Sequence, residues 1–181
     1  PFGEAIGRLV EMGADFELLL PIVESVRGLV TSELGKWPKQ PHILTGEEDK
    51  FRAFKCARVA LAASGTVTLE LALTGAPMVV AYKVDPIMMP VLRRLITAES
   101  AVLANLILGE RVVPELLQEH CTPANIASAL MPLLQATPTR AKQVAALSRL
   151  PDLMQLESGT PSEAAAHIVL HYADTGRQPA A

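Results

Sequence analysis

The chain has 181 residues, of which 50% are hydrophobic, and its formal net charge is −3 at pH 7. This length and composition are enough for one sizeable core, so we expect a single globular domain over residues 1–181. The slight acidic excess argues against a nucleic-acid partner, because phosphate backbones are normally bound by basic surfaces. Cys56 and Cys121 have neither zinc nor redox spacing, so no metal site is expected and a reducing cytoplasmic setting fits.

The apolar runs are short, and the first residues of the chain already follow a helical pattern. The longest runs, such as residues 76–82, fall well below the roughly 20 residues of a membrane-spanning helix. The sequence starts with Pro1-Phe2 rather than with an initiator Met, and the helical spacing of apolar residues begins at once. We therefore expect this sequence to be a fragment of a larger protein.

Apolar strands alternate with helical segments along the first half of the chain. The spacing predicts helices over 1–13, 24–34, 47–56, 66–74 and 85–96, and strands over 16–23, 41–45, 58–63 and 78–83. It further predicts a short edge strand at 101–103, a helix over 114–119, helices over 123–135, 138–150 and 161–173, and a frayed end from residue 174.

The strands are uniformly apolar, which indicates a parallel sheet with helices on both faces. We therefore predict an α/β fold of the Rossmann-like, doubly wound kind, with extra carboxyl-terminal helices in a segment covering 123–173. Gly-x-Gly-x-x-Gly and Gly-x-x-x-x-Gly-Lys-Ser/Thr loops are both absent from the sequence, which disfavours a dinucleotide dehydrogenase and a P-loop enzyme.

Ser64-Gly65-Thr66 lies at the junction between a predicted strand and the helix that follows it. In an open parallel sheet, ligands bind at the carboxyl ends of the strands, next to the free N–H groups of such helices. Gly65 allows a close backbone approach, and the two hydroxyls add hydrogen-bond donors. The turn therefore predicts a site for a diphosphate.

Glu70 follows Thr66 by four residues, so the two side chains share a helix face. It is too far along for a capping box, whose acid would fall at Val67. A carboxylate among leucines is costly unless it accepts hydrogen bonds, and a ribose diol would donate two. The pattern leaves an alternative open, in which the turn only caps the helix and Glu70 faces solvent.

Residues 62–118 resemble the nucleotide-binding half of GT-B glycosyltransferases, and specifically the bacterial lipid-A-disaccharide synthase family. The resemblance is carried by the order and spacing of ASGTVTLELALTGAPMVVAYK (63–83), LANLILGERVVPELLQE (103–119) and PANIASALMPLL (123–134). Arg93-Arg94-Leu95 also fits, and a weaker similarity covers the whole chain. Before this domain's first helix, the family has a first strand and a Gly-Ser-Arg loop, which this chain lacks. We expect the sheet to have an unpaired edge at that place.

The resemblance implies roles for seven residues. Ser64, Gly65 and Thr66 would contact the diphosphate, and Glu70 the ribose hydroxyls. Asn105 would lie near a phosphate or the transferred sugar. Glu115 and Gln118 would face the same cleft from a helix that begins at Pro114. For the last three, a loop turn, a first-turn acid and a solvated side chain remain the structural alternatives.

The activity implied by the resemblance is that of an inverting hexosyltransferase in lipid A biosynthesis. It joins UDP-2,3-diacylglucosamine to 2,3-diacylglucosamine 1-phosphate and releases UDP, without a metal or other cofactor. The amino-terminal acceptor domain, with the catalytic base, is missing from this chain, so the fragment alone is expected to be inactive. A UDP-sugar 2-epimerase of the same fold and a noncatalytic nucleotide-sugar-binding subunit are the alternatives.

The lipid substrates implied by the resemblance suggest where the protein works. We expect a cytoplasmic protein, compatible with a peripheral position on the inner face of the bacterial inner membrane and with a homo-oligomer. Residues 87–96 combine soft apolar side chains with two arginines, as either a membrane-surface patch or a core helix with a charged outer face would. Lys83, at the end of a strand, would contact either a phosphate or solvent.

Overall fold

The computed structural model describes residues 1–83, 100–156 and 159–176. The chain forms two compact units, Pro1–Leu150 and Pro151–Ala181, which we describe separately. The predicted helix over 85–96 and Arg93-Arg94-Leu95 lie outside the described residues. All strands described below belong to the first unit.

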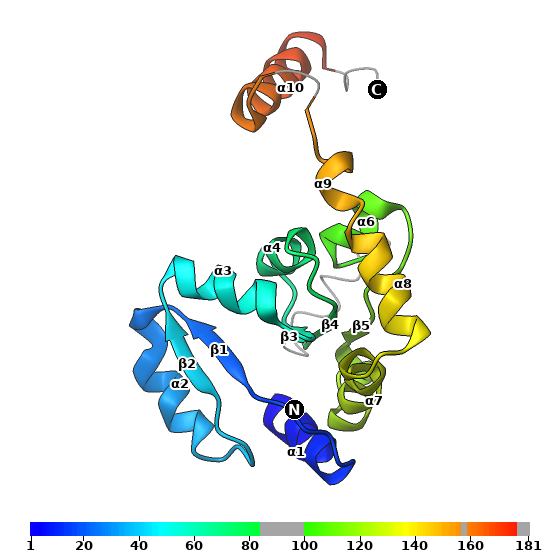
Figure 1. Cartoon of the computed structure of the whole chain (residues 1–181). Helices are drawn as coiled ribbons and strands as arrows, with labels where there is room; N and C mark the ends of the chain where they lie inside the picture. Colours follow the sequence, from blue (N-terminus) through cyan, green and yellow to red (C-terminus); the bar gives the residue numbers. More distant parts are fainter. Residues whose placement is uncertain (84–99, 157–158, 177–181) are drawn as a thin grey trace. The chain divides into compact units, whose positions relative to one another are not determined.

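Figure 1 shows the order of the elements along the chain. The first part contains α1 (Phe2–Glu11), β1 (Leu19–Ile22), η1 (Glu24–Val26), α2 (Arg27–Leu34), β2 (His42–Thr45), α3 (Glu47–Cys56), β3 (Ala60–Ala62), α4 (Val67–Leu73) and β4 (Met78–Tyr82). After residue 100 come α6 (Leu103–Leu108), β5 (Glu115–Leu117), η2 (Gln118–His120), α7 (Pro123–Leu134), α8 (Pro138–Leu147), α9 (Leu150–Leu153) and α10 (Pro161–Thr175).

The described strands pair in parallel and form two sheets, with orders β1-β2 and β3-β4-β5. The register places Ala62 opposite Val80 and Tyr82 opposite Leu117, so the carboxyl ends of β3, β4 and β5 lie at one edge. Residues of β1 and β3 line a cavity of about 650 Å³ between the two sheets. The predicted doubly wound α/β fold is confirmed, and its sheet is divided in two.

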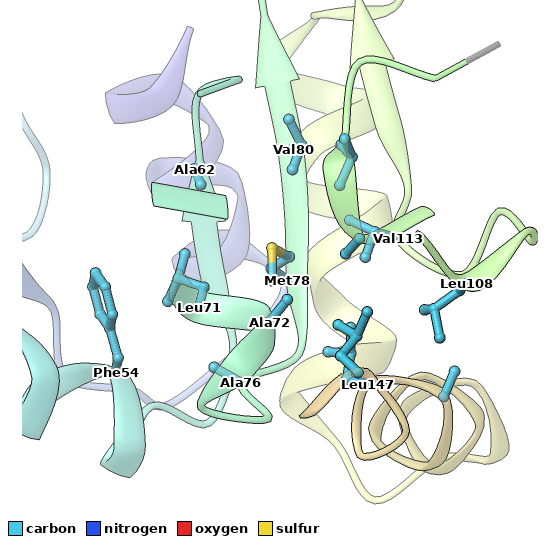
Figure 2. Packing of buried hydrophobic residues seen from close by; sticks show 14 residues of the cluster. Phe54, Ala62, Leu71, Ala72, Ala76, Met78, Val80, Leu108, Val113 and Leu147 are labelled. Atoms are coloured by element: carbon cyan, nitrogen blue, oxygen red, sulfur yellow. The ribbon is translucent and has the colours of Figure 1, made fainter. Parts of the chain in front are cut away.

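Strand β4 explains why the sheet has helices on both faces. Met78 and Val80 pack into a core with α3, α4, α6 and α8, whereas Val79 and Ala81 pack into a second core with α1 and α7. Figure 2 shows the first of these cores around Met78 and Val80. Because successive strand side chains point to opposite faces and both faces are covered, the whole strand is apolar. Each large side chain buried here contributes about 1.5–3 kcal/mol.

Polar side chains fix the helices around this sheet. Thr122 and Thr137 cap α7 and α8 by accepting hydrogen bonds from backbone N–H groups three residues further on, and a proline follows each cap. Gln143 of α8 is buried, and it donates to Met78 O at 3.1 Å and accepts from Met78 N at 2.8 Å. This side chain satisfies the backbone at the start of β4, so α8 is tied to the sheet.

Two predicted elements are wrong. Residues 101–103 do not form an edge strand, because Val102 is the extended cap of α6 and the chain turns into that helix at once. Residues 115–117 form β5 rather than a helix, because the edge of β4 is open there and the N–H of Val80 donates to Pro114 O at 2.9 Å. The order Pro-Glu suits a helix start, but pairing with a fully buried strand overrides this local preference.

The second unit contains α10, which begins with a capping box. Thr160 accepts from the N–H of Glu163, and the Glu163 carboxylate accepts from the N–H of Thr160 at 2.7 Å. The helix continues to Thr175 and ends at Gly176 in the left-handed region, so residues 174 and 175, which were predicted to be frayed, are helical. Within the described ranges, none of the helices has the length and apolar character needed to cross a membrane.

Candidate functional site

The Ser64–Thr66 turn connects the end of β3 to the start of α4, as predicted. Gly65 has φ +149°, a region where a side chain is strained, although the space around it is open. The backbone N–H groups of residues 64–66 donate no hydrogen bond to any other described residue. They are therefore available to an external acceptor at the carboxyl edge of the sheet.

A cavity of about 380 Å³ lies beside this turn. It is lined at the strand ends by Ala63, which precedes the turn, and by Tyr82 and Lys83 at the end of β4. Trp37 and the first residues of α1 complete the lining. Ala63, which directly precedes the turn, and Lys83 thus border the same hollow, which is mainly apolar.

Ser64 links the turn to the segment before α6. Its hydroxyl donates to Ala101 O at 3.1 Å, and the N–H of Ala101 donates to Glu115 Oε2 at 2.8 Å. Two predicted site residues from different motifs, Ser64 and Glu115, are therefore joined through one residue, Ala101. The Ser64 oxygen still has acceptor capacity, since the hydroxyl is the donor in this contact.

Glu115 is the centre of a hydrogen-bond network. Its Oε1 accepts from the hydroxyl of Ser100 and from Asn105 Nδ2, the latter at 2.8 Å. With the contact from Ala101, three donors meet one carboxylate at the start of β5. These three hydrogen bonds fix the chain around residues 100 and 101 against the sheet.

Asn105 is only 3% exposed and uses its whole amide group inside the protein. Its Nδ2 donates to Val113 O at 3.0 Å as well as to Glu115, and its Oδ1 accepts from the N–H groups of Val112 and Val113 at 3.1 and 2.9 Å. Two donors and two acceptor positions are the full capacity of a carboxamide. In this structure, Asn105 holds the loop before β5 and has no free hydrogen-bonding group to offer.

Glu70 is not simply exposed to solvent. Its Oε2 lies 3.1 Å from Nζ of Lys50 on α3, and its side chain is 36% exposed. Lys50 also lies 2.8 Å from Glu47 Oε2. Hydrogen bonds to Glu47 and Glu70 raise the pKa of Lys50, so the ammonium is charged at neutral pH. No hydrogen bond among the described residues joins Glu70 to the network of Glu115.

Gln118 follows the carboxyl end of β5, and its backbone is unusual. It has φ +50°, and it is the one non-glycine residue with positive φ in the parts of the chain that the structure describes. Such strain persists only where the surroundings impose it, and it is frequent at functional sites. The prediction that Gln118 and Glu115 lie three apart on one helix is wrong, since Glu115 is in β5 and Gln118 begins η2.

Comparison with known proteins identifies the chain's relatives. A sequence model described as lipid-A-disaccharide synthetase matches residues 1–169. The chain belongs to the lipid-A-disaccharide synthetase family. The proteins named lipid-A-disaccharide synthase in Rhodopseudomonas palustris (strain BisB18) and in Bradyrhizobium diazoefficiens are each 48% identical, over 93% and 98% of this chain. The one in Gluconobacter oxydans is 41% identical over 84% of it.

The matched region is a minor part of these relatives. It covers 43%, 45% and 37% of the three proteins, so the chain spans less than half of their length. The resemblance found in the sequence motifs is thereby confirmed as family membership. The roles of the individual residues rest on the geometry above.

For this member of the lipid-A-disaccharide synthetase family, sequence reasoning predicted the turn between a strand and a helix, but it predicted neither the hydrogen-bond network around Glu115 nor the contact of Lys50 with Glu70. The motifs around Ser64 and Asn105 are local, and the residues fall where they were expected along the chain. Lys50 stands in a charged helix whose first turn holds three acids, Glu47, Glu48 and Asp49, and a solvated salt bridge is the usual role there. Its contact with Glu70 depends on how two helices pack, which no local signal predicts.

Proposed function

We propose that this chain is the donor-binding half of a lipid-A-disaccharide synthase, an inverting glycosyltransferase. Family membership over residues 1–169 is the observation that carries the proposal. It is supported by the free backbone N–H groups at Ser64, Gly65 and Thr66, next to a cavity at the carboxyl edge of three parallel strands. The proposed substrates are UDP-2,3-diacylglucosamine and 2,3-diacylglucosamine 1-phosphate.

In the proposed reaction, a hydroxyl oxygen of the acceptor attacks the anomeric carbon of the donor sugar. The bond between that carbon and the β-phosphate oxygen breaks, UDP leaves with the electron pair, and the configuration inverts. The hydroxyl proton passes to a base that we assign to the other half of the enzyme. The N–H groups at residues 64–66, which have no acceptor among the described residues, would stabilise the charge that develops on the β-phosphate.

The other predicted residues divide into two roles under this proposal. Glu70 accepts hydrogen bonds from the ribose hydroxyls, and Gln118 reaches the sugar or phosphate from the end of β5. Asn105 and Glu115 act indirectly. Asn105 donates to Glu115, Glu115 accepts from the N–H of Ala101, and the carbonyl of Ala101 accepts from Ser64. We propose them as supports of the turn rather than as direct contacts of the nucleotide.

Titration calorimetry of this chain with UDP tests the nucleotide site. We expect binding that weakens when Glu70 is replaced in the Glu70→Ala variant. No heat at about millimolar UDP, in a sample shown to be folded by circular dichroism, would refute the site in this chain. A chain that binds no nucleotide would be a scaffold rather than a nucleotide-binding domain.

An activity assay tests the reaction class. A polypeptide extended to the length of the relatives, incubated with the lipid donor and radiolabelled acceptor, should form the disaccharide and release UDP. Conversion of the donor sugar to its 2-epimer without disaccharide would instead support the epimerase alternative. The relatives compared above are all named as synthases, which favours the first result.

The acyl chains of both proposed substrates place the reaction next to a membrane. We propose a cytoplasmic enzyme in peripheral contact with the bilayer, since lipid substrates of this kind partition into it. Sedimentation of the extended polypeptide with vesicles of anionic phospholipid measures this contact. Recovery of all the protein in the supernatant would contradict it.

A further inference from the structure

The contact between Lys50 and Glu70 joins two helices that sequence reasoning treated separately. We propose that Lys50 is a positioning residue, which holds the Glu70 carboxylate in place for the ribose hydroxyls of the nucleotide. This inference rests on the proposed function, in which Glu70 binds the ribose. It adds a residue from α3 to a site otherwise built at the ends of β3 and β5.

The ammonium group of Lys50 is fully used by carboxylates. Nζ donates to Glu47 Oε1 at 3.1 Å and lies 2.8 Å from Glu47 Oε2 and 3.1 Å from Glu70 Oε2. An ammonium has three hydrogens, and three carboxylate oxygens surround it. Lys50 is therefore an internal link between α3 and α4, with no hydrogen left to bind a phosphate.

Glu70 keeps one oxygen for a ligand. Lys50 occupies the Oε2 side of the carboxylate, whereas Oε1 makes no hydrogen bond with any of the residues that the structure describes. A carboxylate oxygen accepts up to two hydrogen bonds, so a hydroxyl can be bound while the contact with Lys50 persists. The ion pair thus orients the acid without blocking it.

The position of Lys50 is itself well defined. Its side chain is 20% exposed, whereas Glu47 is 78% exposed, and Nζ lies 4.6 Å from the ring centroid of Phe51. By contrast, Arg52 on the same helix is 71% exposed and pairs with Glu48 and Asp49 within α3. A cation held by packing, by an aromatic ring and by two carboxylates can fix the position of the Glu70 side chain. An isolated ion pair on the surface does so poorly.

Fixing Glu70 before the nucleotide arrives lowers the entropy lost on binding. A free glutamate side chain samples many rotamers, and a ligand that needs one of them must immobilise it. Releasing Glu70 by removing Lys50 should weaken ribose binding by about fivefold. Because the effect passes through the ribose hydroxyls, it should vanish for a nucleotide that lacks them.

Titration calorimetry of the full chain with UDP and 2′,3′-dideoxy-UDP tests this inference. The wild-type chain should bind UDP about tenfold more tightly than the dideoxy nucleotide. Lys50→Met should lower the affinity for UDP by about fivefold and leave the affinity for dideoxy-UDP unchanged. Lys50→Arg keeps the cation and should therefore retain most of the wild-type affinity for UDP. Arg52→Met removes the same charge from the same helix and should alter neither affinity.

A second substitution provides a test that does not depend on the Met variant alone. Glu70→Gln keeps the shape of the side chain and should abolish the preference for UDP over dideoxy-UDP. Adding Lys50→Met to Glu70→Gln should then cause no further loss, because coupled residues act non-additively. Circular dichroism and the thermal midpoint establish that each variant is folded.

Three outcomes overturn the inference, and they are distinguishable. If Lys50→Met lowered the affinity for both nucleotides equally, the effect would be a general electrostatic or structural one. If it lowered neither affinity, the Lys50–Glu70 ion pair would have no role in nucleotide binding. If the wild-type chain bound both nucleotides equally, the role of Glu70 would fail together with that of Lys50. If it bound neither, the proposed nucleotide function of this chain would fail first.

Discussion

The two sides of the candidate site differ in how much hydrogen-bonding capacity they leave open. On the β5 side, Asn105 is buried and saturated, and Glu115 accepts three hydrogen bonds from the protein. On the α4 side, the N–H groups of residues 64–66 have no acceptor among the described residues, and Glu70 has one oxygen without a hydrogen bond. Both sides carry motif residues of the same family, but Asn105 and Glu115 are held by hydrogen bonds within the protein, whereas the turn at residues 64–66 can bind a ligand without breaking such bonds. We therefore propose that Asn105 and Glu115 support the site and that the α4 side meets the nucleotide.

The largest effect should come from the β5 side and should concern stability. Asn105→Ala removes four hydrogen bonds and leaves buried backbone groups unpaired, so we expect the free energy of unfolding to fall by about 3 kcal/mol. Chemical denaturation followed by circular dichroism measures this change. An unchanged unfolding midpoint together with lost UDP binding would make Asn105 a ligand contact and break the comparison.

Gln143 offers a matched control on α8. It is 2% exposed and makes three hydrogen bonds to backbone groups, with Met78 and Val112 as its partners. Gln143→Ala should lower the free energy of unfolding by about 2 kcal/mol, because these groups lose their partners. At temperatures where the variant is folded, its affinity for UDP should equal that of the wild type.

On the α4 side, Gly65→Ala should affect binding more than stability. The added Cβ meets no atom within 4 Å, but φ +149° is unfavourable for alanine, so we expect a loss of about 1–2 kcal/mol in unfolding free energy. Relaxation of that strain would reorient the N–H groups of residues 64–66. The affinity for UDP should therefore fall by more than the loss of stability explains. Calorimetry with UDP on the folded variant checks this, and an unaltered affinity would argue that the turn is not the diphosphate site.

Gln118→Gly separates the side chain from the backbone at the end of β5. Glycine adopts φ +50° without strain, so relief of the backbone strain alone should raise the free energy of unfolding by about 0.5 kcal/mol. If the side chain contacts the sugar or phosphate, the affinity for the UDP-sugar should nevertheless fall. A destabilised variant with normal binding would move Gln118 to the supporting side of the comparison.

The smallest effect should be a pH dependence of the α3–α4 contact. The folded-state pKa of Lys50 is raised by Glu47 and Glu70, so its stabilisation is fully present below the unfolded-state pKa and is lost as the pH rises through the folded-state value. The difference in thermal midpoint between the wild type and Lys50→Met should therefore be constant near neutral pH and shrink in alkaline solution. A difference that stays constant as the solution is made alkaline would contradict the assignment of this contact to the Lys50 ammonium.

The sequence predicted the fold where the signal was long and periodic. The helix over 47–56 is confirmed to the residue as α3, and the strand at 78–83 appears as β4, because its apolar run is buried on both faces. Strand β5 was missed, since three residues after a proline carry no periodicity and gain their conformation only by pairing with Val80–Tyr82. Local patterns cannot report a pairing partner that lies 35 positions away in the register.

The candidate site, like the fold, was predictable only where the sequence signal was local. The position of Ser64–Thr66 at the end of a strand was predictable, because glycine and hydroxyl residues at such a junction have a local conformational cause. The saturation of Asn105 and the contact of Lys50 with Glu70 were not, since both depend on elements that meet only in the folded chain. The family motifs named these residues as candidates, but they did not separate residues that support the turn from residues that would contact a ligand.

The central claim is that the turn at residues 64–66 binds the diphosphate of UDP. Nuclear magnetic resonance of the labelled chain, titrated with UDP and with uridine, measures it at the atoms concerned. We predict that the backbone N–H signals of Gly65 and Thr66 shift with UDP and stay in place with uridine, which lacks the phosphates. Shifts confined to other parts of the chain, or equal shifts with both ligands, would contradict the account.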